Sequence, residues 1–133
     1  MDTTYRYLLD TNIVSELMRD PQGPVTRRIA RVGERSVCTS IIVACELRYG
    51  VAKKGSARLT QQLEAVLEVL PVLSLEPAVD RRYGEIRADL ERRGTPIGPN
   101  DLLIAAQALS LGLVLVTDGV QEFRRVKGLE VKN

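Results

Sequence analysis

The sequence contains no histidine, and this absence removes several classes of active site. Serine-histidine-aspartate and cysteine-histidine sites both need an imidazole base. Most zinc sites need histidine or several thiolates, and this chain has only two cysteines. Any catalysis must therefore depend on carboxylates, hydroxyls, lysine or a bound metal ion.

Long apolar runs are also missing. No stretch of about 18 uncharged apolar residues occurs, and the opening "MDTTYRYLLD" has neither a basic leader nor a small-residue cleavage site. We therefore expect no membrane segment and a cytoplasmic location. The chain has 133 residues, 44% of them hydrophobic, and no linker or repeat, which predicts a single domain over 1–133.

The two cysteines, Cys38 and Cys45, do not have the spacing of a zinc knuckle or of a CxxC redox pair. Both lie among apolar neighbours in the sequence. We expect two reduced thiols in the core rather than a disulfide.

Net charge is only +2, but the basic residues are clustered. The clusters are Arg27, Arg28, Arg31 and Arg35; Lys53, Lys54 and Arg58; Arg81, Arg82, Arg87, Arg92 and Arg93; and Arg124, Arg125 and Lys127. The simpler interpretation is solvated helix faces interleaved with acids. The alternative is a surface that follows the phosphates of a nucleic acid.

The spacing of apolar residues and the positions of glycine and proline predict alternating strands and helices. We expect strands in "YRYLLD", "RSVCTS", "PVLSL", "LVLVT" and "LEVKN". We expect helices over 12–19, 24–32, 40–54, 57–70, 77–93 and 100–111. Because several strands are apolar on both faces, the pattern indicates an α/β sandwich around a mostly parallel sheet. Ligands of such sheets bind at the carboxyl ends of the strands.

Four acids stand in apolar surroundings. Asp10 and Asp118 each end an apolar strand, Glu46 lies on an apolar helix, and Asp101 opens another. Asp10, Asp101 and Asp118 each have a simpler explanation as a turn, cap or first-turn residue, worth about 1 kcal/mol. Glu46 is harder to explain, because a lone buried carboxylate is costly unless it is paired, protonated or coordinated.

If these acids converge, a cation is the natural way to relieve their repulsion. Two carboxylates about 4 Å apart repel by roughly 4 kcal/mol at an effective dielectric of 20. An all-oxygen ligand set selects hard ions, so we expect Mg²⁺, with Mn²⁺ as a substitute. Such an ion suits phosphoryl chemistry, which predicts hydrolysis of a phosphate ester.

Four segments in this order resemble the PIN-domain ribonucleases, specifically VapC toxins of bacterial toxin-antitoxin modules. They are "YLLDTNIVSEL", "SIIVACELRYGV", "RYGEIRADLERRGTPIGPNDLLIAAQAL" and "LVLVTDGVQEFRRVKGLEVKN", which together span nearly the whole chain. The resemblance implies a PIN-like α/β/α sandwich. It also implies that Asp10, Glu46 and Asp101 are catalytic, metal-binding acids.

The resemblance further implies that Asn12 and Thr117 are polar residues that orient these acids. The last position of the site is less defined, because Gly119 stands where many relatives have a polar residue. Either Asp118 supplies the fourth oxygen group or the site uses three acids, and we favour Asp118 as a fourth catalytic metal ligand.

In function, the resemblance implies a metal-dependent endoribonuclease that cuts structured RNA such as tRNA or rRNA with activated water. It implies a homodimer and a VapB-like antitoxin that inhibits the toxin, with the toxin-antitoxin complex binding operator DNA. No DNA-recognition motif is visible in this chain itself.

Two other classes of protein compete with this interpretation. A response-regulator receiver or a haloacid-dehalogenase-like phosphatase would also use Mg²⁺, but Asp10 is followed by Thr11 and Asn12 rather than by the second aspartate of DxD. The other alternative is a PIN-like module, degraded at Gly119, that only binds RNA or a partner.

Overall fold

A computed structural model describes residues 5–133, which are built around one five-stranded sheet. In sequence order the strands are β1 (Tyr7–Leu9), β2 (Val37–Ser40), β3 (Val72–Leu73), β4 (Val114–Val116) and β5 (Val131–Lys132). They lie in the spatial order β3-β2-β1-β4-β5, and every pairing is parallel. The predicted α/β class is therefore confirmed, with a sheet that is parallel throughout the described residues.

The register of the sheet explains where a site can form. Leu9 at the end of β1 pairs with Thr39 of β2 on one side and with Val116 of β4 on the other. Asp10 directly follows β1, and Thr117 directly follows β4. Because all strands run the same way, these residues emerge together at the carboxyl edge.

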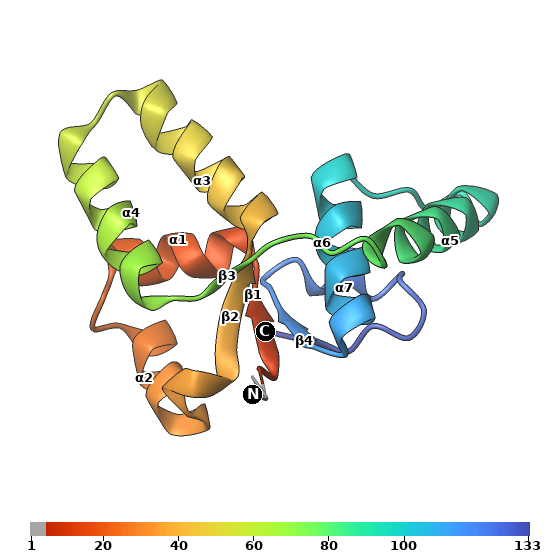
Figure 1. The fold of residues 1–133 in the computed structure, drawn as a ribbon, viewed down its shortest axis with the longest axis horizontal. Helices are drawn as coiled ribbons and strands as arrows, with labels where there is room; N and C mark the ends of the chain where they lie inside the picture. The colour runs from red at the N-terminus through yellow and green to blue at the C-terminus, as the bar shows by residue number, and fades with distance from the viewer. Residues whose placement is uncertain (1–4) are drawn as a thin grey trace.

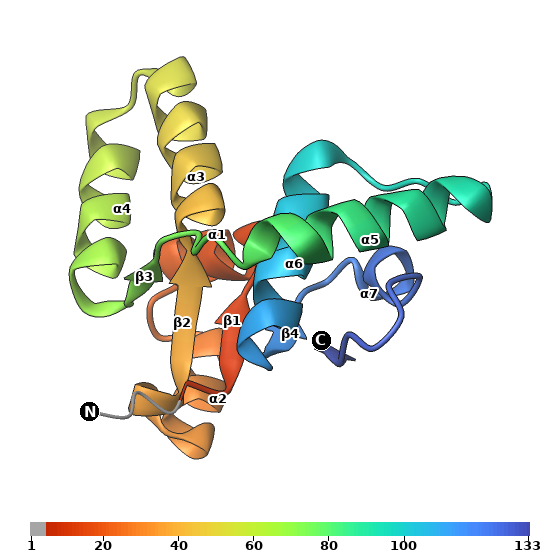
Figure 2. The ribbon, with the colours of Figure 1, turned by 45° about the vertical axis from the view of Figure 1, so that its right-hand side comes forward.

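Helices flank the sheet in two groups (Figure 1). The first group is α1 (Thr11–Arg19), α2 (Pro24–Val32), α3 (Ile41–Lys54) and α4 (Ala57–Val69), with a 3-10 turn at Glu34–Ser36. The second is α5 (Val79–Arg92), α6 (Pro99–Leu111) and the short α7 (Val120–Phe123). Figure 2 shows α3 and α4 side by side as a hairpin, and α5 lying across α6.

Local sequence signals fix several of these boundaries. Ser40 begins α3 by accepting a hydrogen bond from the Ile42 amide, and Ser56 caps α4 in the same way at the Leu59 amide. Gly55 ends α3 in the left-handed conformation, with a φ of 63°, which glycine adopts without steric cost. These caps set the α3–α4 hairpin that carries Glu46.

The prediction for the cysteines is half wrong. Cys38 is fully buried in β2, and its burial raises the pKa of the thiol to about 12. Cys45 is a free but exposed thiol, because it lies on the outer face of α3 in line with the exposed Ile41 and Tyr49. Helix α3 is apolar on nearly all sides, so its sequence does not reveal which side faces the core.

Within residues 5–133, no helix has the length and apolar character needed to cross a bilayer.

Candidate active site

Asp10 lies at the carboxyl end of the central strand, where it is only 7% exposed. Its carboxylate accepts a hydrogen bond of 2.7 Å from the hydroxyl of Thr117, which follows β4 and is fully buried. Although Asp10 occupies the position before α1, its side chain makes no capping hydrogen bond. The Asp10 side chain instead contacts Thr117 at the edge of the sheet.

Burial raises the pKa of Asp10 above its usual value, and the negative charges of Glu46 and Asp118 raise it further. The Thr117 hydrogen bond acts in the opposite direction, because it favours the ionised carboxylate. Asp10 therefore lies close enough to Glu46 and Asp118 for their charges to affect it.

Glu46 projects from α3 and is held by two neutral donors. The Thr11 hydroxyl, at the start of α1, donates to Oε1 at 2.5 Å. The Asn100 amide, at the start of α6, donates to Oε2 at 3.3 Å. Three helices therefore meet at this carboxylate, which explains how a glutamate on an apolar helix is stabilised.

Asp101 lies in the first turn of α6, partly buried, and is the most strongly perturbed of these acids. Its pKa is raised to about 7, first by burial, then by a hydrogen bond with the carboxyl of Glu122 and by the charges of Glu122, Asp10 and Glu46. Its place in the first turn also suits the helix dipole. A carboxyl group this close to three others titrates near neutral pH, which is typical of functional sites.

Asp118 is exposed, in the turn that follows β4. Its Oδ1 accepts a hydrogen bond of 3.2 Å from the side-chain amide of Asn12. The adjacent Gly119 has an ordinary φ of −86°, and its amide donates to the Thr117 hydroxyl at 2.9 Å. Thr117 therefore contacts Asp10, whereas Asn12 contacts Asp118 rather than Asp10, Glu46 or Asp101.

Sequence reasoning missed three polar residues in this region: Thr11, Asn100 and Glu122. Thr11 and Asn100 are direct chain neighbours of Asp10 and Asp101, so their proximity to the site was a usable signal. Glu122 belongs to α7, whose single turn is too short to show a helical repeat of apolar residues. It adds a fifth carboxyl group to the cluster, which we call the acidic centre: Asp10, Glu46, Asp101, Asp118 and Glu122.

The acidic centre has no basic partner. None of its five members forms an ion pair within residues 5–133; the ion pairs of this part of the chain join α3 to α4, lie along α5, or join α5 to Lys127. Its hydrogen-bond donors, Thr11, Asn12, Asn100 and Thr117, are all neutral. The repulsion within this part of the molecule is therefore not balanced by protein cations.

The chemistry of the donor set fits a hard divalent cation, because it offers only oxygen ligands and excess negative charge. As the side chains are oriented, however, no three acidic or cysteine residues among 5–133 form a ready-made ligand group. Thr11, Asn100 and Thr117 hold oxygens of Glu46 and Asp10 in their present positions. These hydrogen bonds fix one oxygen of Asp10 and both oxygens of Glu46.

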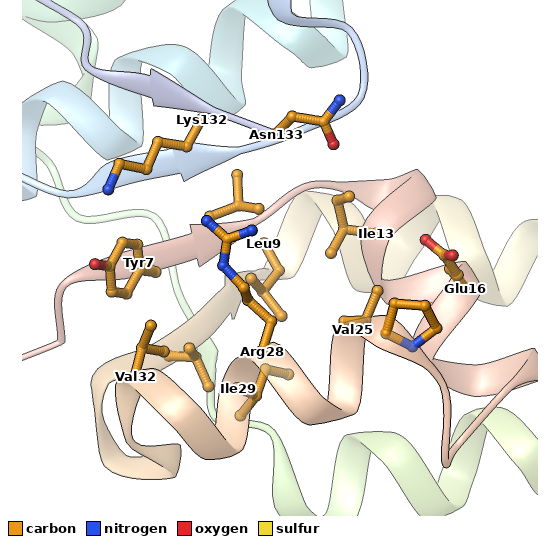
Figure 3. A pocket seen from close by; sticks show the side chains of 13 residues that line it. Tyr7, Leu9, Ile13, Glu16, Val25, Arg28, Ile29, Val32, Lys132 and Asn133 are labelled. Carbon is orange, nitrogen blue, oxygen red and sulfur yellow. The ribbon is translucent and has the colours of Figure 1, made fainter.

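The acidic centre is separate from the apolar hollow shown in Figure 3. That hollow, about 310 Å³, lies between α2 and strands β1, β4 and β5, and none of the predicted acids lines it. A second hollow of about 510 Å³ lies on the other side of α2, against α1 and α4. Neither offers the convergent acids needed for phosphate-ester chemistry.

Comparison with known proteins agrees with this geometry. The family model described as "PIN domain" matches residues 7–129. The chain is 34% identical over 129 residues to a tRNA(fMet)-specific endonuclease VapC from Shigella flexneri, covering 96% of this chain and 97% of that protein. It is 38% identical over 130 residues to ribonuclease VapC2 from Haemophilus influenzae, with coverage of 96% and 97%.

The crystal structure of VapBC2 from Rickettsia felis bound to a DNA fragment from their promoter contains a similar chain. The two superpose with a TM-score of 0.89 at 32% sequence identity, over 96% of this chain and 97% of that one. Both the family match and the superposition span the acidic centre from Asp10 to Glu122.

Proposed function

Since this chain belongs to the PIN-domain family and, within it, to the VapC ribonucleases, we propose that it is a metal-dependent endoribonuclease toxin of a toxin-antitoxin module. Its proposed substrate is structured RNA such as tRNA or rRNA. Its proposed place of action is the cytoplasm. One observation carries the proposal: five carboxyl groups gather at the carboxyl edge of the sheet with no protein cation to balance them.

We assign Asp10, Glu46, Asp101 and Asp118 as the residues that would hold the ion, with Mg²⁺ as the proposed metal and Mn²⁺ as a substitute. A divalent ion bound there would activate water and neutralise charge that develops on the phosphoryl group. Thr117 and Asn12 then keep Asp10 and Asp118 oriented through the hydrogen bonds described above. Thr11 and Asn100 do the same for Glu46.

Binding of the proposed ion is linked to a proton on Asp101. Asp101 has a pKa of about 7, so in the metal-free protein it is only partly ionised at neutral pH. Metal binding needs the ionised form, and a nearby cation lowers the pKa of a carboxyl group. We infer that Asp101 loses its proton when the ion binds.

A VapB-like antitoxin is the proposed partner, by analogy with the VapBC2 complex, which is bound to promoter DNA. Helix α2 buries none of its residues fully and is flanked by the two hollows of about 310 and 510 Å³. Val32 at the end of α2 is 40% exposed, and Val69 at the end of α4 is 81% exposed. This apolar surface suits an amphipathic segment of the antitoxin.

We also propose that the toxin is a homodimer. Ile41, Cys45 and Tyr49 form an exposed, mostly apolar line at four-residue spacing along α3, and Tyr49 is 66% exposed. A second copy of the chain would cover this line.

The test is cleavage of total RNA by protein purified free of antitoxin. We expect fragments in Mg²⁺ or Mn²⁺, none in EDTA, and none from Asp10→Ala in either metal. Asp20→Ala is a matched control, because Asp20 is an exposed acid at the far end of α1 and should leave cleavage unchanged. Retention of RNA without cleavage in any divalent metal would instead support a binding module.

A further inference from the structure

The acidic centre creates a difficulty for any nucleic-acid substrate. Its five carboxyl groups repel RNA phosphates, and one divalent ion would offset only part of that charge. A substrate backbone that crosses the centre therefore needs protein cations beside it. Since no lysine or arginine within residues 5–133 pairs with the centre, these cations must lie at its border.

Five basic residues lie at the end of α5 and in the segment after α7. They are Arg92, Arg93, Arg124, Arg125 and Lys127. In sequence, Arg92 and Arg93 are separated by more than thirty positions from the others, yet contacts join the two segments. Figures 1 and 2 both show the chain after α7 running close to α5 and α6.

Two of these arginines fasten the segments together. Arg93 forms an ion pair of 2.6 Å with Asp89 and also donates to the backbone carbonyl of Arg125. Arg125 in turn donates to the carbonyl of Pro96 at 3.3 Å, in the loop that leads into α6. The side chains of Arg93 and Arg125 are thus occupied by structural contacts.

The other three remain available to solvent and a ligand. Arg92 and Arg124 are exposed, and Lys127, although 3.6 Å from Asp89, is 78% exposed. Asp89 is the acid these cations share, and its pKa is lowered first by its hydrogen bond to Arg93 and also by the charges of Lys127 and Arg92. We call Arg92, Arg124 and Lys127 the basic rim.

Along the chain, both segments of the basic rim lead into the acidic centre. Arg124 is two positions after Glu122, whose carboxyl group contacts Asp101. The loop held by Arg125 at Pro96 continues directly into the first turn of α6, where Asp101 lies. Positive charge fixed beside a negative catalytic centre is the arrangement that steers and holds a polyanion.

We propose that the basic rim binds phosphates of the substrate RNA next to the cleaved bond. The inference rests on the proposed ribonuclease function, and it deepens that function by assigning the surface that tracks the backbone. Arginine and lysine contact phosphates without reading bases, so the rim contributes affinity rather than sequence preference. Lys127 is 78% exposed and lies 3.6 Å from Asp89, so it can exchange this ion pair for a phosphate.

The experiment compares Arg92→Gln/Arg124→Gln/Lys127→Gln with a control of equal charge loss, Arg31→Gln/Arg35→Gln/Arg58→Gln. The control residues are exposed and lie on α2, the 3-10 turn and α4, away from α5 and α7. Binding of labelled, unfractionated tRNA is measured in EDTA by fluorescence anisotropy over a range of KCl concentrations. Cleavage rates in Mg²⁺ and Mn²⁺ affinity by electron paramagnetic resonance are measured for the same proteins.

We expect the rim variant to bind tRNA about 10- to 100-fold more weakly, and its log–log salt slope to be shallower by about 2 to 3. The KM for tRNA should rise while kcat, melting temperature and Mn²⁺ affinity match the wild type. Arg124→Gln alone guards against a folding defect and should reduce the salt slope by about 1.

Equal tRNA affinity and salt slope in the rim and control variants would overturn the proposal while wild-type cleavage still supports the nuclease. Loss of antitoxin binding with unchanged tRNA binding would also overturn it and would assign the rim to an acidic protein segment instead. A wild type that cuts no RNA in any divalent metal would refute the proposed function itself.

Discussion

At the scale of single residues, Asp101 carries a charge that the metal-free fold holds at a cost. Its pKa is about 7 in the folded protein and near 3.8 in the unfolded chain, so the folded state binds the proton more tightly. The related stability is complete below pH 3.8 and is lost as pH rises through 7. Asp101→Asn removes the cost and should raise the melting temperature by about 2–5 °C at pH 8 in EDTA.

The same substitution should give a smaller increase at pH 5, where much of the wild-type group is still protonated. Differential scanning calorimetry at the two pH values checks this. An equal shift at both would show that the charge of Asp101 is not the cause. Because asparagine cannot supply the ionised ligand that we propose for Asp101, RNA cleavage should fall by at least about 100-fold, whereas Asp80→Asn at an exposed position of α5 should leave it unchanged.

Thr11 is predicted to matter through Glu46. Thr11→Val keeps the shape of the side chain but removes the hydroxyl that donates to Oε1 at 2.5 Å. We expect Mn²⁺ affinity to fall by about 10- to 100-fold, as when other orienting partners of metal ligands are lost. Isothermal titration calorimetry measures this, and Thr11→Ser, which retains the hydroxyl, should bind close to wild type. Equal losses in both variants would point to packing instead.

The acids could be found from sequence because their positions were chemically unusual. Asp10 and Asp118 follow apolar strands, and Glu46 interrupts an apolar helix. Their orientation could not be found this way. Glu46 is held by Asn100, which lies 54 positions away, and such a contact depends on the angle at which α3 and α6 meet. Composition and period contain no information on that angle.

At the scale of elements, Gln107 joins α6 to the strand at the edge of the sheet. It is fully buried, and its amide nitrogen donates to the carbonyls of Leu73 and Ser74 at 3.2 and 3.1 Å. Gln107→Leu keeps the volume but leaves both carbonyls without this donor. We expect a loss of about 1–3 kcal/mol in the free energy of unfolding, measured in urea. The exposed Gln121→Leu is the control and should change stability by less than about 0.5 kcal/mol.

If Gln107→Leu proved as stable as wild type, these carbonyls would have to find other partners. A change in RNA cleavage larger than the loss of folded protein would show that the bond also sets the position of Asp101, six residues earlier on α6.

Element prediction succeeded where the apolar period was long. The second predicted helix matches α2 at both ends, and Gly55 and Gly94 mark real helix ends. It failed for α7 and the 3-10 turn at Glu34–Ser36, which are too short to show a period. The strands are shorter than predicted, since "PVLSL" pairs only at Val72–Leu73, and pairing depends on the neighbouring strand.

At the scale of the whole molecule, a bound ion should stabilise the fold. A metal that binds only the folded protein adds about 2.7 kcal/mol when present at 100 times its Kd. We therefore expect Mg²⁺ or Mn²⁺ to raise the melting temperature by several degrees at pH 8. The increase should be smaller at pH 6, where a proton competes with the ion for Asp101. Asp10→Ala should abolish the increase. A similar increase in that variant would place the ion elsewhere.

The central position of β1 has a consequence for synthesis of the chain. Asp10 leaves the ribosome early, but its hydrogen-bond partner Thr117 lies 107 positions later. Thr117 directly follows β4, the strand that pairs with β1. A nascent polypeptide that has not yet delivered β4 has no formed centre. Nuclease activity should therefore arise only after translation has passed this point, which gives the producing cell an interval in which the unfinished chain cannot cut RNA.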